Sequence, residues 1–187
     1  MKVELVIRGG RVVDSEGERR LDVGIADGVV VALDETVEAE RELDASGCIV
    51  GPGLVDIHAH LRQPGKEEAE TIESGSRAAV LGGFTAVVAM PNTTPAIDSA
   101  AVVREVQQLG RASLCDVEVA AAITVGRKGD TLAPMAELAA LGVRMFTDDG
   151  GGVQDARLMR RALEYGAAFG AVLSQHCEVD ALSLIHI

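Results

Sequence analysis

Short runs of alternating apolar and polar residues occupy the first fifty positions, which is typical of strands with one buried face. "VELVIRGGRVVD" predicts two strands around Gly9-Gly10, and "RLDVGIADGVVVALD" predicts two more around Asp27-Gly28, a dipeptide that favours a hairpin. No helical spacing interrupts this region. Four or five short strands are too few to close on themselves, so residues 1–52 are predicted to form the N-terminal part of a small β-sandwich or sheet.

From Gly53 onward, apolar strands alternate with segments of helical spacing such as "KEEAETIESGSRAAVLGG". The predicted strands are "GLVDIHAH", "FTAVVAM", "DVEVAAAIT", "VRMFTD" and "AVLSQH". This alternation predicts a parallel α/β fold. The units are short and regular, and no GxGxxG follows the first strand, which favours a TIM-type (β/α)8 barrel over a dinucleotide-binding sheet. Residues 53–181 are therefore predicted to supply about five of the eight strands of a partial barrel.

Net charge and cysteine content limit which binding partners and which cellular compartment are expected. The chain has 187 residues and a formal net charge of −12, so its surface repels phosphate backbones and anionic lipids. Neither nucleic acid nor a membrane is an expected partner, and no apolar run reaches the roughly 18 residues of a membrane span. Cys48, Cys115 and Cys177 are odd in number and widely spaced, which fits the reducing cytoplasm better than a disulfide framework.

Polar side chains capable of binding a metal stand where most of the predicted strands end, and barrel enzymes place their chemistry at those ends. His58 and His60 follow the first strand, Asp149 the fourth and His176 the fifth. Side chains two apart on a strand point the same way, so both histidines could reach one ion. Imidazole and carboxylate ligands suit zinc. Two polar residues at a strand end are the alternative, but the convergence from several strands favours a metal site.

Other features at these strand ends admit two interpretations. "TDDGGG" is also a strong turn signal that alone would explain Asp149, and a lone histidine at position 176 would more often belong to a core. Cys177 is interpreted as a buried thiol. Arg62 could bind a carboxylate through paired hydrogen bonds, and Asn92 could add an amide donor. A surface arginine and a loop asparagine are the alternatives; substrate contact is favoured for Arg62, and the two interpretations of Asn92 stay open.

Four segments together resemble the amidohydrolase superfamily: "GPGLVDIHAHLRQPG", "GGFTAVVAMPNTTPAID", "FTDDG" and "SQHCE". Within it they are similar to the dihydroorotases that bridge two metal ions with an aspartate, and the resemblance covers residues 5–181. Hydantoinases and many allantoinases place a carboxylated lysine at the bridging position, whereas this sequence has no lysine after Lys128. The resemblance implies two zinc ions per complete site, with metal ligands at His58, His60, Asp149 and His176. It also implies that Arg62 and Asn92 contact the substrate.

The implied reaction is the reversible interconversion of N-carbamoyl-L-aspartate and dihydroorotate in pyrimidine synthesis. A homodimer, or a complex with aspartate transcarbamoylase, is the assembly that the resemblance implies. The family also has a further zinc-binding histidine and a general acid/base aspartate, and neither is found in these 187 residues, so we expect the fragment alone to be inactive. Allantoinase, another cyclic amidohydrolase, or a non-catalytic scaffold for a transcarbamoylase are the alternatives. Residues 182–187, "LSLIHI", are interpreted as a non-native tail, with His186 not a ligand.

Overall fold

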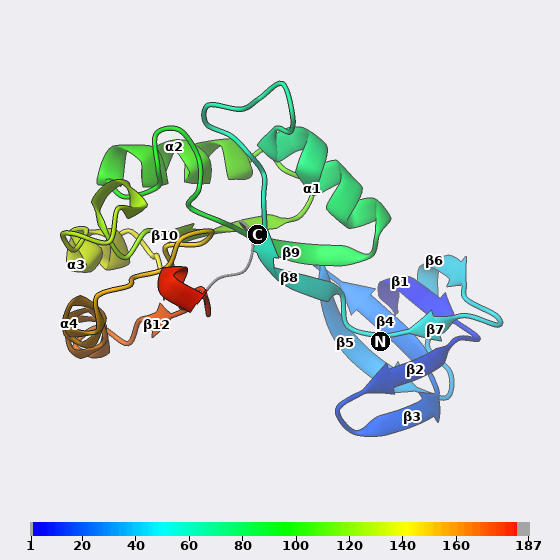
Figure 1. Cartoon of the computed structure of the whole chain (residues 1–187). Helices are drawn as coiled ribbons and strands as arrows, with labels where there is room; N and C mark the ends of the chain where they lie inside the picture. The colour runs from blue at the N-terminus through cyan, green and yellow to red at the C-terminus, as the bar shows by residue number, and fades with distance from the viewer. Residues whose placement is uncertain (1, 183–187) are drawn as a thin grey trace. The chain divides into compact units, whose positions relative to one another are not determined.

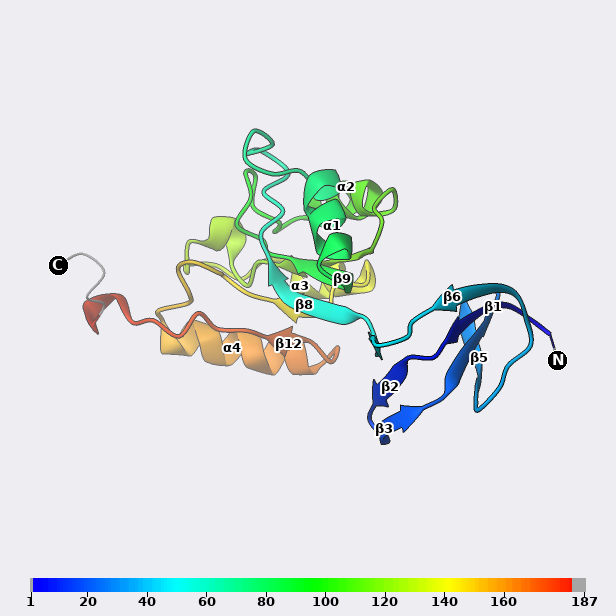
Figure 2. The ribbon, with the colours of Figure 1, turned by 90° about the vertical axis from the view of Figure 1, so that its right-hand side faces the viewer.

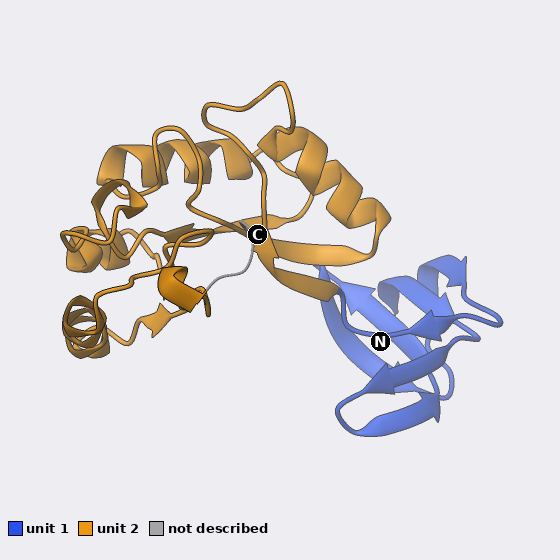
Figure 3. Ribbon diagram, in the orientation of Figure 1, with its two compact units in different colours: residues 1–53 blue, residues 54–187 orange. Residues whose placement is uncertain are grey.

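The computed structural model describes residues 2–182, and the chain divides into two units, Met1–Gly53 and Leu54–Ile187 (Figure 3). Each unit has its own cluster of buried apolar side chains. Five of the six residues of the expected non-native tail, 183–187, lie outside the described residues. No helix in the described part of the chain is long and apolar enough to cross a membrane.

Two small sheets make up the first unit, and strands from different parts of the sequence meet in each. One has the order β5-β4-β1-β6, and the other has the order β3-β2-β7. The strands are β1 (Val3–Arg8), β2 (Arg11–Asp14), β3 (Gly17–Arg20), β4 (Asp22–Ala26), β5 (Val29–Asp34), β6 (Ala39–Asp44) and β7 (Ile49–Val50). The expectation of four or five strands is wrong, because β3 is entirely polar apart from its glycine and β7 has only two residues. Neither carries an alternating pattern.

The two glycine-containing turns of this unit have different roles. Asp27 and Gly28 have φ values of 51° and 72° and join the antiparallel strands β4 and β5, so the predicted hairpin is confirmed. At Gly9-Gly10 the chain passes from one sheet to the other. A side chain at Gly10 would stand 2.5 Å from Val50 Cγ2, so the close approach of the two segments requires glycine there.

Five parallel strands form the second unit, and they are hydrogen-bonded in chain order (Figure 1). The predicted partial barrel is confirmed: the sheet is curled and its helices lie along its outer, convex side (Figure 1), so that in the second view they stand both above and below the strands (Figure 2). The elements are β8 (Leu54–Ala59), α1 (Ile72–Leu81), β9 (Phe84–Ala89), α2 (Ala100–Gly110), β10 (Asp116–Ala121), α3 (Met135–Ala140), β11 (Met145–Phe146), α4 (Ala156–Ala167) and β12 (Val172–Leu173), with short 3-10 turns at Val125–Arg127 and Asp180–Leu182.

Helix α1 begins later than its sequence pattern indicated. The expected helical segment started at Lys66, but the helix starts at Ile72. Thr71 caps it: its hydroxyl accepts a hydrogen bond from the Ser74 backbone N–H, and the Ser74 hydroxyl accepts one from the Thr71 N–H. This reciprocal capping gives hydrogen-bond acceptors to the backbone N–H groups of Thr71 and Ser74 at the start of the helix, and so favours a helix that begins here.

Aliphatic side chains between the sheet and its helices form the main core. Ile123, Met135, Leu138 and Phe146 are fully buried in it. Strand β8 is different, because Leu54, Val55 and Ile57 are 53%, 59% and 64% exposed. Within the described residues β8 pairs only with β9, and β12 only with β11. The half-barrel therefore has two unpaired strand edges and apolar surface that its own helices do not cover.

Candidate metal centre

Asp149 follows β11 and is held in place by its neighbour Asp148. The Asp148 carboxylate is fully buried and accepts hydrogen bonds from the backbone N–H of Ile123 (2.8 Å), from the backbone N–H of Thr124 (3.0 Å) and from the Thr124 hydroxyl. Ile123 and Thr124 follow the end of β10, so these hydrogen bonds connect the loop after β11 to the end of the neighbouring strand. Asp149, which is 5% exposed, is thereby left to face the other strand ends.

The turn that "TDDGGG" predicted is also present. The backbone N–H groups of Gly151 and Gly152 both donate to the Asp148 carbonyl, at 3.1 and 2.9 Å. Turn formation and a candidate ligand are therefore compatible in one segment. The glycines close the turn behind Asp148, and the Asp149 side chain remains directed at the histidines.

His58 and His60, at the end of β8, meet the carboxylate of Asp149. His58 Nε2 is 3.3 Å from Asp149 Oδ1, and His60 Nε2 is 3.6 Å from Asp149 Oδ2. One ligand atom from each of the three residues lies within 4.8 Å of the others. Ligands bound tetrahedrally at about 2.0–2.2 Å stand roughly 3.3–3.6 Å apart. The spacing and the donor types therefore fit one metal ion.

His176 approaches the same carboxylate from the segment that follows β12. Its Nδ1 lies 3.7 Å from Asp149 Oδ1, and its Nε2 lies 3.3 Å from Glu178 Oε2. The structure therefore brings the other three predicted metal ligands, His58, His60 and His176, around Asp149. The compact three-residue group consists of His58, His60 and Asp149, and His176 lies beside it.

Asn92, which follows β9, contacts two of these ligands. Its Nδ2 donates to Asp149 Oδ2 at 2.9 Å, and its Oδ1 is 2.9 Å from His60 Nδ1. Sequence analysis placed Asn92 at this rim but did not foresee either contact. Its contact with substrate stays a prediction.

Arg62 lies in the loop after β8, in the left-handed region with φ of 60°. It is half-buried, and no hydrogen bond or ion pair of its guanidinium is found within residues 2–182. The loop is fixed by its neighbours: Thr94 N donates to the Pro64 carbonyl at 3.0 Å. A side chain at Gly65, whose φ is 96°, would stand 2.0 Å from the Thr94 carbonyl oxygen. The arginine predicted to bind substrate is thus presented on a fixed loop at the same edge of the sheet.

Arg127 is a residue that sequence analysis missed. It follows β10 in a 3-10 turn, has φ of 57°, and donates from Nη1 to the Asp149 carbonyl. Among the described residues its buried Nε has no hydrogen-bond partner. Its only signal in the sequence was its place beyond a strand end, because nothing in the local sequence marks an arginine that donates to a backbone carbonyl in the loop after the next strand.

The interpretation of Cys177 as a buried thiol is wrong. The side chain is exposed, and its Sγ lies 3.5 Å from the Gln175 carbonyl oxygen. Cys177 stands in an irregular segment past the end of β12, where no helix or strand covers it. The neighbouring His176 is half-buried.

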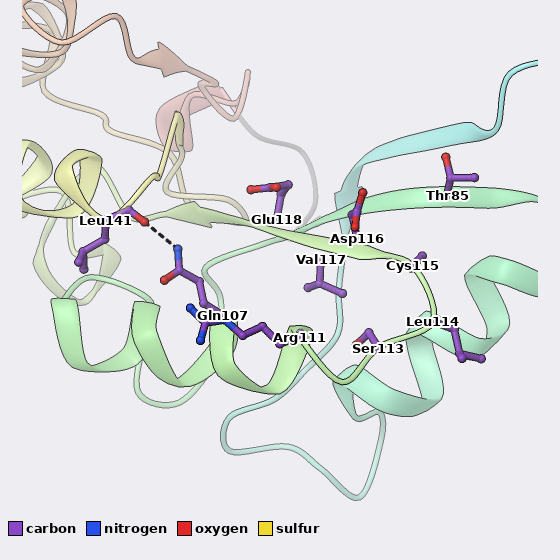
Figure 4. A pocket seen from close by; sticks show the side chains of 11 residues that line it. Thr85, Gln107, Arg111, Ser113, Leu114, Cys115, Asp116, Val117, Glu118 and Leu141 are labelled. Atoms are coloured by element: carbon purple, nitrogen blue, oxygen red, sulfur yellow. Dashed lines mark hydrogen bonds between the residues drawn. The ribbon is translucent and has the colours of Figure 1, made fainter. Parts of the chain in front are cut away.

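Two hollows flank this half-barrel, and only one touches the candidate ligands. A cavity of about 490 Å³ lies at the amino end of β10 (Figure 4), where Asp116 and Glu118 point to one side of the strand and Val117 points to the other. It contains none of the candidate ligands. A second hollow of about 310 Å³ is lined by His58 and His60. Gly75, Ala78 and Ala79 of α1 also line the second hollow, whereas Asp149 and His176 do not, so it lies between α1 and β8 rather than at the meeting point of the four candidate ligands.

Sequence comparison places this chain among known proteins. Residues 47–184 match the family model of dihydro-orotase-like proteins. A dihydroorotase from Citrifermentans bemidjiense is 47% identical over 186 residues, covering 96% of this chain and 44% of the relative. A dihydroorotase from Aquifex aeolicus is 43% identical over 189 residues, covering 97% of this chain and 44% of the relative. The chain thus spans less than half the length of these curated relatives.

Among solved structures, the L-hydantoinase (dihydropyrimidinase) from Arthrobacter aurescens superimposes with a TM-score of 0.82 at 23% identity, covering 96% of this chain and 42% of that one. At this identity the likeness concerns the fold. The family is carried by the sequence match, which spans most of the chain. On that match, the chain belongs to the dihydro-orotase-like family.

Proposed function

We propose that this chain forms the amino-terminal portion of a zinc-dependent dihydroorotase, which interconverts N-carbamoyl-L-aspartate and dihydroorotate. The observation that carries the proposal is the meeting of His58, His60 and His176 at one buried carboxylate, that of Asp149. The curated relatives at 43–47% identity carry the name dihydroorotase. The three described cysteines are unpaired, which supports a cytoplasmic location as part of the same proposal.

Each residue has a distinct task in the proposed reaction. His58, His60 and Asp149 would hold one zinc ion, and Asp149 together with His176 would hold part of a second site. Zinc bound there would supply an activated water and polarise the amide carbonyl of the substrate. Arg62 would pair with the substrate carboxylate through two charge-assisted hydrogen bonds. Asp148 and Arg127 would keep the Asp149 loop in position.

The nature of residue 149 favours this substrate over related cyclic amides. Hydantoinases and many allantoinases resemble this chain but use a carboxylated lysine at the bridging position. Here an aspartate occupies it, and the sequence has no lysine after Lys128. A non-catalytic scaffold is a weaker alternative, because a scaffold has no need to retain four side chains that gather at one point.

The decisive experiment uses the full-length protein encoded by the parent gene. Purified with zinc, it should hydrolyse dihydroorotate, and His58→Ala should abolish turnover, because the group of three ligands loses one member. Hydantoin and allantoin serve as competing substrates. Preference for either of them, or turnover that persists in His58→Ala, would contradict the proposal.

Residues 1–187 expressed alone form part of the same proposal. They should bind at most one zinc ion weakly and show no dihydroorotate hydrolysis above background. The unpaired edges of β8 and β12 should also promote association, because unpaired strand edges recruit further strands. Metal analysis after dialysis and size-exclusion chromatography measure these outcomes. Two tightly held ions in a monomeric fragment would contradict this part of the proposal.

A further inference from the structure

Among the described residues, the half-buried arginines differ in whether a carboxylate neutralises them. Arg8 and Arg19 each form ion pairs with two carboxylates. Arg62 and Arg127 form none within residues 2–182, although the chain has 29 acidic residues. A partly buried charge is unfavourable unless a partner of opposite charge accompanies it. Both arginines stand in loops after barrel strands, so an anion at that edge of the sheet would supply the missing partner.

The backbone of these two arginines is also unusual. Outside the β4–β5 hairpin, they are the non-glycine residues with positive φ in the described part of the chain, at 60° for Arg62 and 57° for Arg127. Such residues are uncommon and are often found at functional sites. The loop holds Arg127 in this conformation: Gly126 N donates to the Asp98 carboxylate at 2.6 Å, and Arg127 N donates to the Thr124 carbonyl at 3.0 Å.

Arg127 lies beside the candidate metal ligands. Its Nη1 donates to the Asp149 carbonyl. A Cβ added at Gly150 would stand 3.7 Å from Arg127 Nη1 and 4.0 Å from Asn92 Nδ2, so both side chains reach the same glycine. Nε is buried without a partner, and Nη2, which also has none among the described residues, is accessible to solvent. Nε and Nη2 form one edge of the guanidinium, and such an edge can bind both oxygens of a carboxylate.

We propose that Arg127 is a second anion-binding residue of the site, which holds the carboxylate that reacts when an open-chain dicarboxylate closes into a ring. The inference rests on the proposed function and deepens it. N-carbamoyl-L-aspartate has two carboxylates and dihydroorotate has one, because ring closure joins the carbamoyl nitrogen to one carboxylate carbon, takes up a proton and releases water. Arg62 is proposed to pair with the carboxylate that persists. Arg127 is bonded to the backbone of Asp149, where the reacting carboxylate must lie.

This role predicts which kinetic constants change in the full-length protein. The contact exists with the open-chain substrate and in the transition state, but not with the ring. Arg127→Met should therefore raise the KM for N-carbamoyl-L-aspartate by about 10- to 100-fold and leave kcat for cyclisation nearly unchanged. Because the equilibrium constant of the reaction is fixed, kcat for hydrolysis should fall by the same factor while the KM for dihydroorotate stays nearly constant.

Two further variants separate this role from other roles of a basic loop. Arg127→Gln keeps a donor for the Asp149 carbonyl but removes the charge and the paired donors. It should behave like Arg127→Met if Arg127 binds an anion, and like the unaltered protein if Arg127 only holds the Asp149 loop. Lys128→Met is the matched control, because it removes the same charge from an exposed neighbour, and its constants should stay close to those of the unaltered protein.

Binding of two small carboxylates tests the inference without turnover. Succinate has two carboxylates on the carbon skeleton of aspartate, and propionate has one. Isothermal titration calorimetry of the zinc-loaded, full-length protein should show that Arg127→Gln weakens succinate binding by about 10- to 100-fold. Propionate can still pair with Arg62, so its affinity should change little. The zinc content of Arg127→Gln should equal that of the unaltered protein.

Four results would overturn the inference: no succinate binding by the unaltered protein, full succinate affinity in Arg127→Gln, an equal loss of affinity for succinate and propionate, or an equal loss in Lys128→Met. The proposed function fails separately. If succinate binding depends on Arg127 but the unaltered protein does not hydrolyse dihydroorotate, the proposed substrate is wrong and the anion-binding role of Arg127 stands.

Discussion

Substituting Asp148 tests whether the buried carboxylate, rather than the turn alone, holds the metal-site loop. The structure gives it three donors: two backbone N–H groups and the Thr124 hydroxyl. Asp148→Ala leaves all three without an acceptor in a site closed to solvent. At about 1–3 kcal/mol for each orphaned group, the free energy of unfolding should fall by at least about 3 kcal/mol. Asp148→Asn keeps one acceptor oxygen for the two N–H groups and should cost about 1–3 kcal/mol.

Urea unfolding of the full-length protein is the assay. With a slope of about 1–3 kcal/mol per molar, the midpoint of Asp148→Ala should fall by about 1 M or more. A double-mutant cycle with Thr124→Val isolates the hydroxyl contact, and its coupling energy should exceed about 0.5 kcal/mol. Zinc affinity should fall in parallel, because Asp149 leaves its place beside His58. An unchanged midpoint in Asp148→Ala, or a coupling energy of zero, would refute the reasoning.

Three further predictions concern the loop after β8 and the cysteines. Arg62→Met in the full-length protein should raise the KM for dihydroorotate by about 10- to 100-fold, through loss of charge-assisted hydrogen bonds, and an unchanged KM would exclude the substrate role. Gly65→Ala should raise KM and lower the melting temperature, because φ is 96° and the new Cβ would meet a loop carbonyl at 2.0 Å; normal values of both would contradict this packing. Burial, and then the nearby Asp116 carboxylate, raises the pKa of the Cys115 thiol, so at pH 8 iodoacetamide should label exposed Cys48 and Cys177 well before Cys115, as peptide mass spectrometry can check.

The sequence pattern was sufficient for the architecture of the second unit and for the strand ends that carry the site. Buried parallel strands are continuous apolar runs, so their order and their final residues can be located without a structure. His58 and His60 were identifiable because side chains two apart on a strand share a side. Asp149 and His176 were identifiable only through the expectation that strand ends converge in a barrel.

Contacts between loops were not predictable in the same way. The bonds of Asn92 to His60 and Asp149 depend on the register of three strands and on rotamers that no local pattern encodes. Arg127 reaches a backbone carbonyl, which leaves no mark on the partner's residue type. Polar or two-residue strands such as β3 and β7 were not predicted, because they lack an alternation of apolar and polar residues.

The sequential order of β8 to β12 has a consequence for how this unit is assembled. Leu54 pairs with Phe84 and Met145 with Val172, so each new strand joins one that lies within about 30 residues of it. The entropy cost of closing a loop grows with its length, so pairing strands that are neighbours in the sequence costs less chain entropy than pairing distant ones would. During synthesis each strand can dock as it leaves the ribosome. The histidine pair is then in place before the aspartate emerges, so the growing sheet itself would deliver the last member of the three-residue group to the first two.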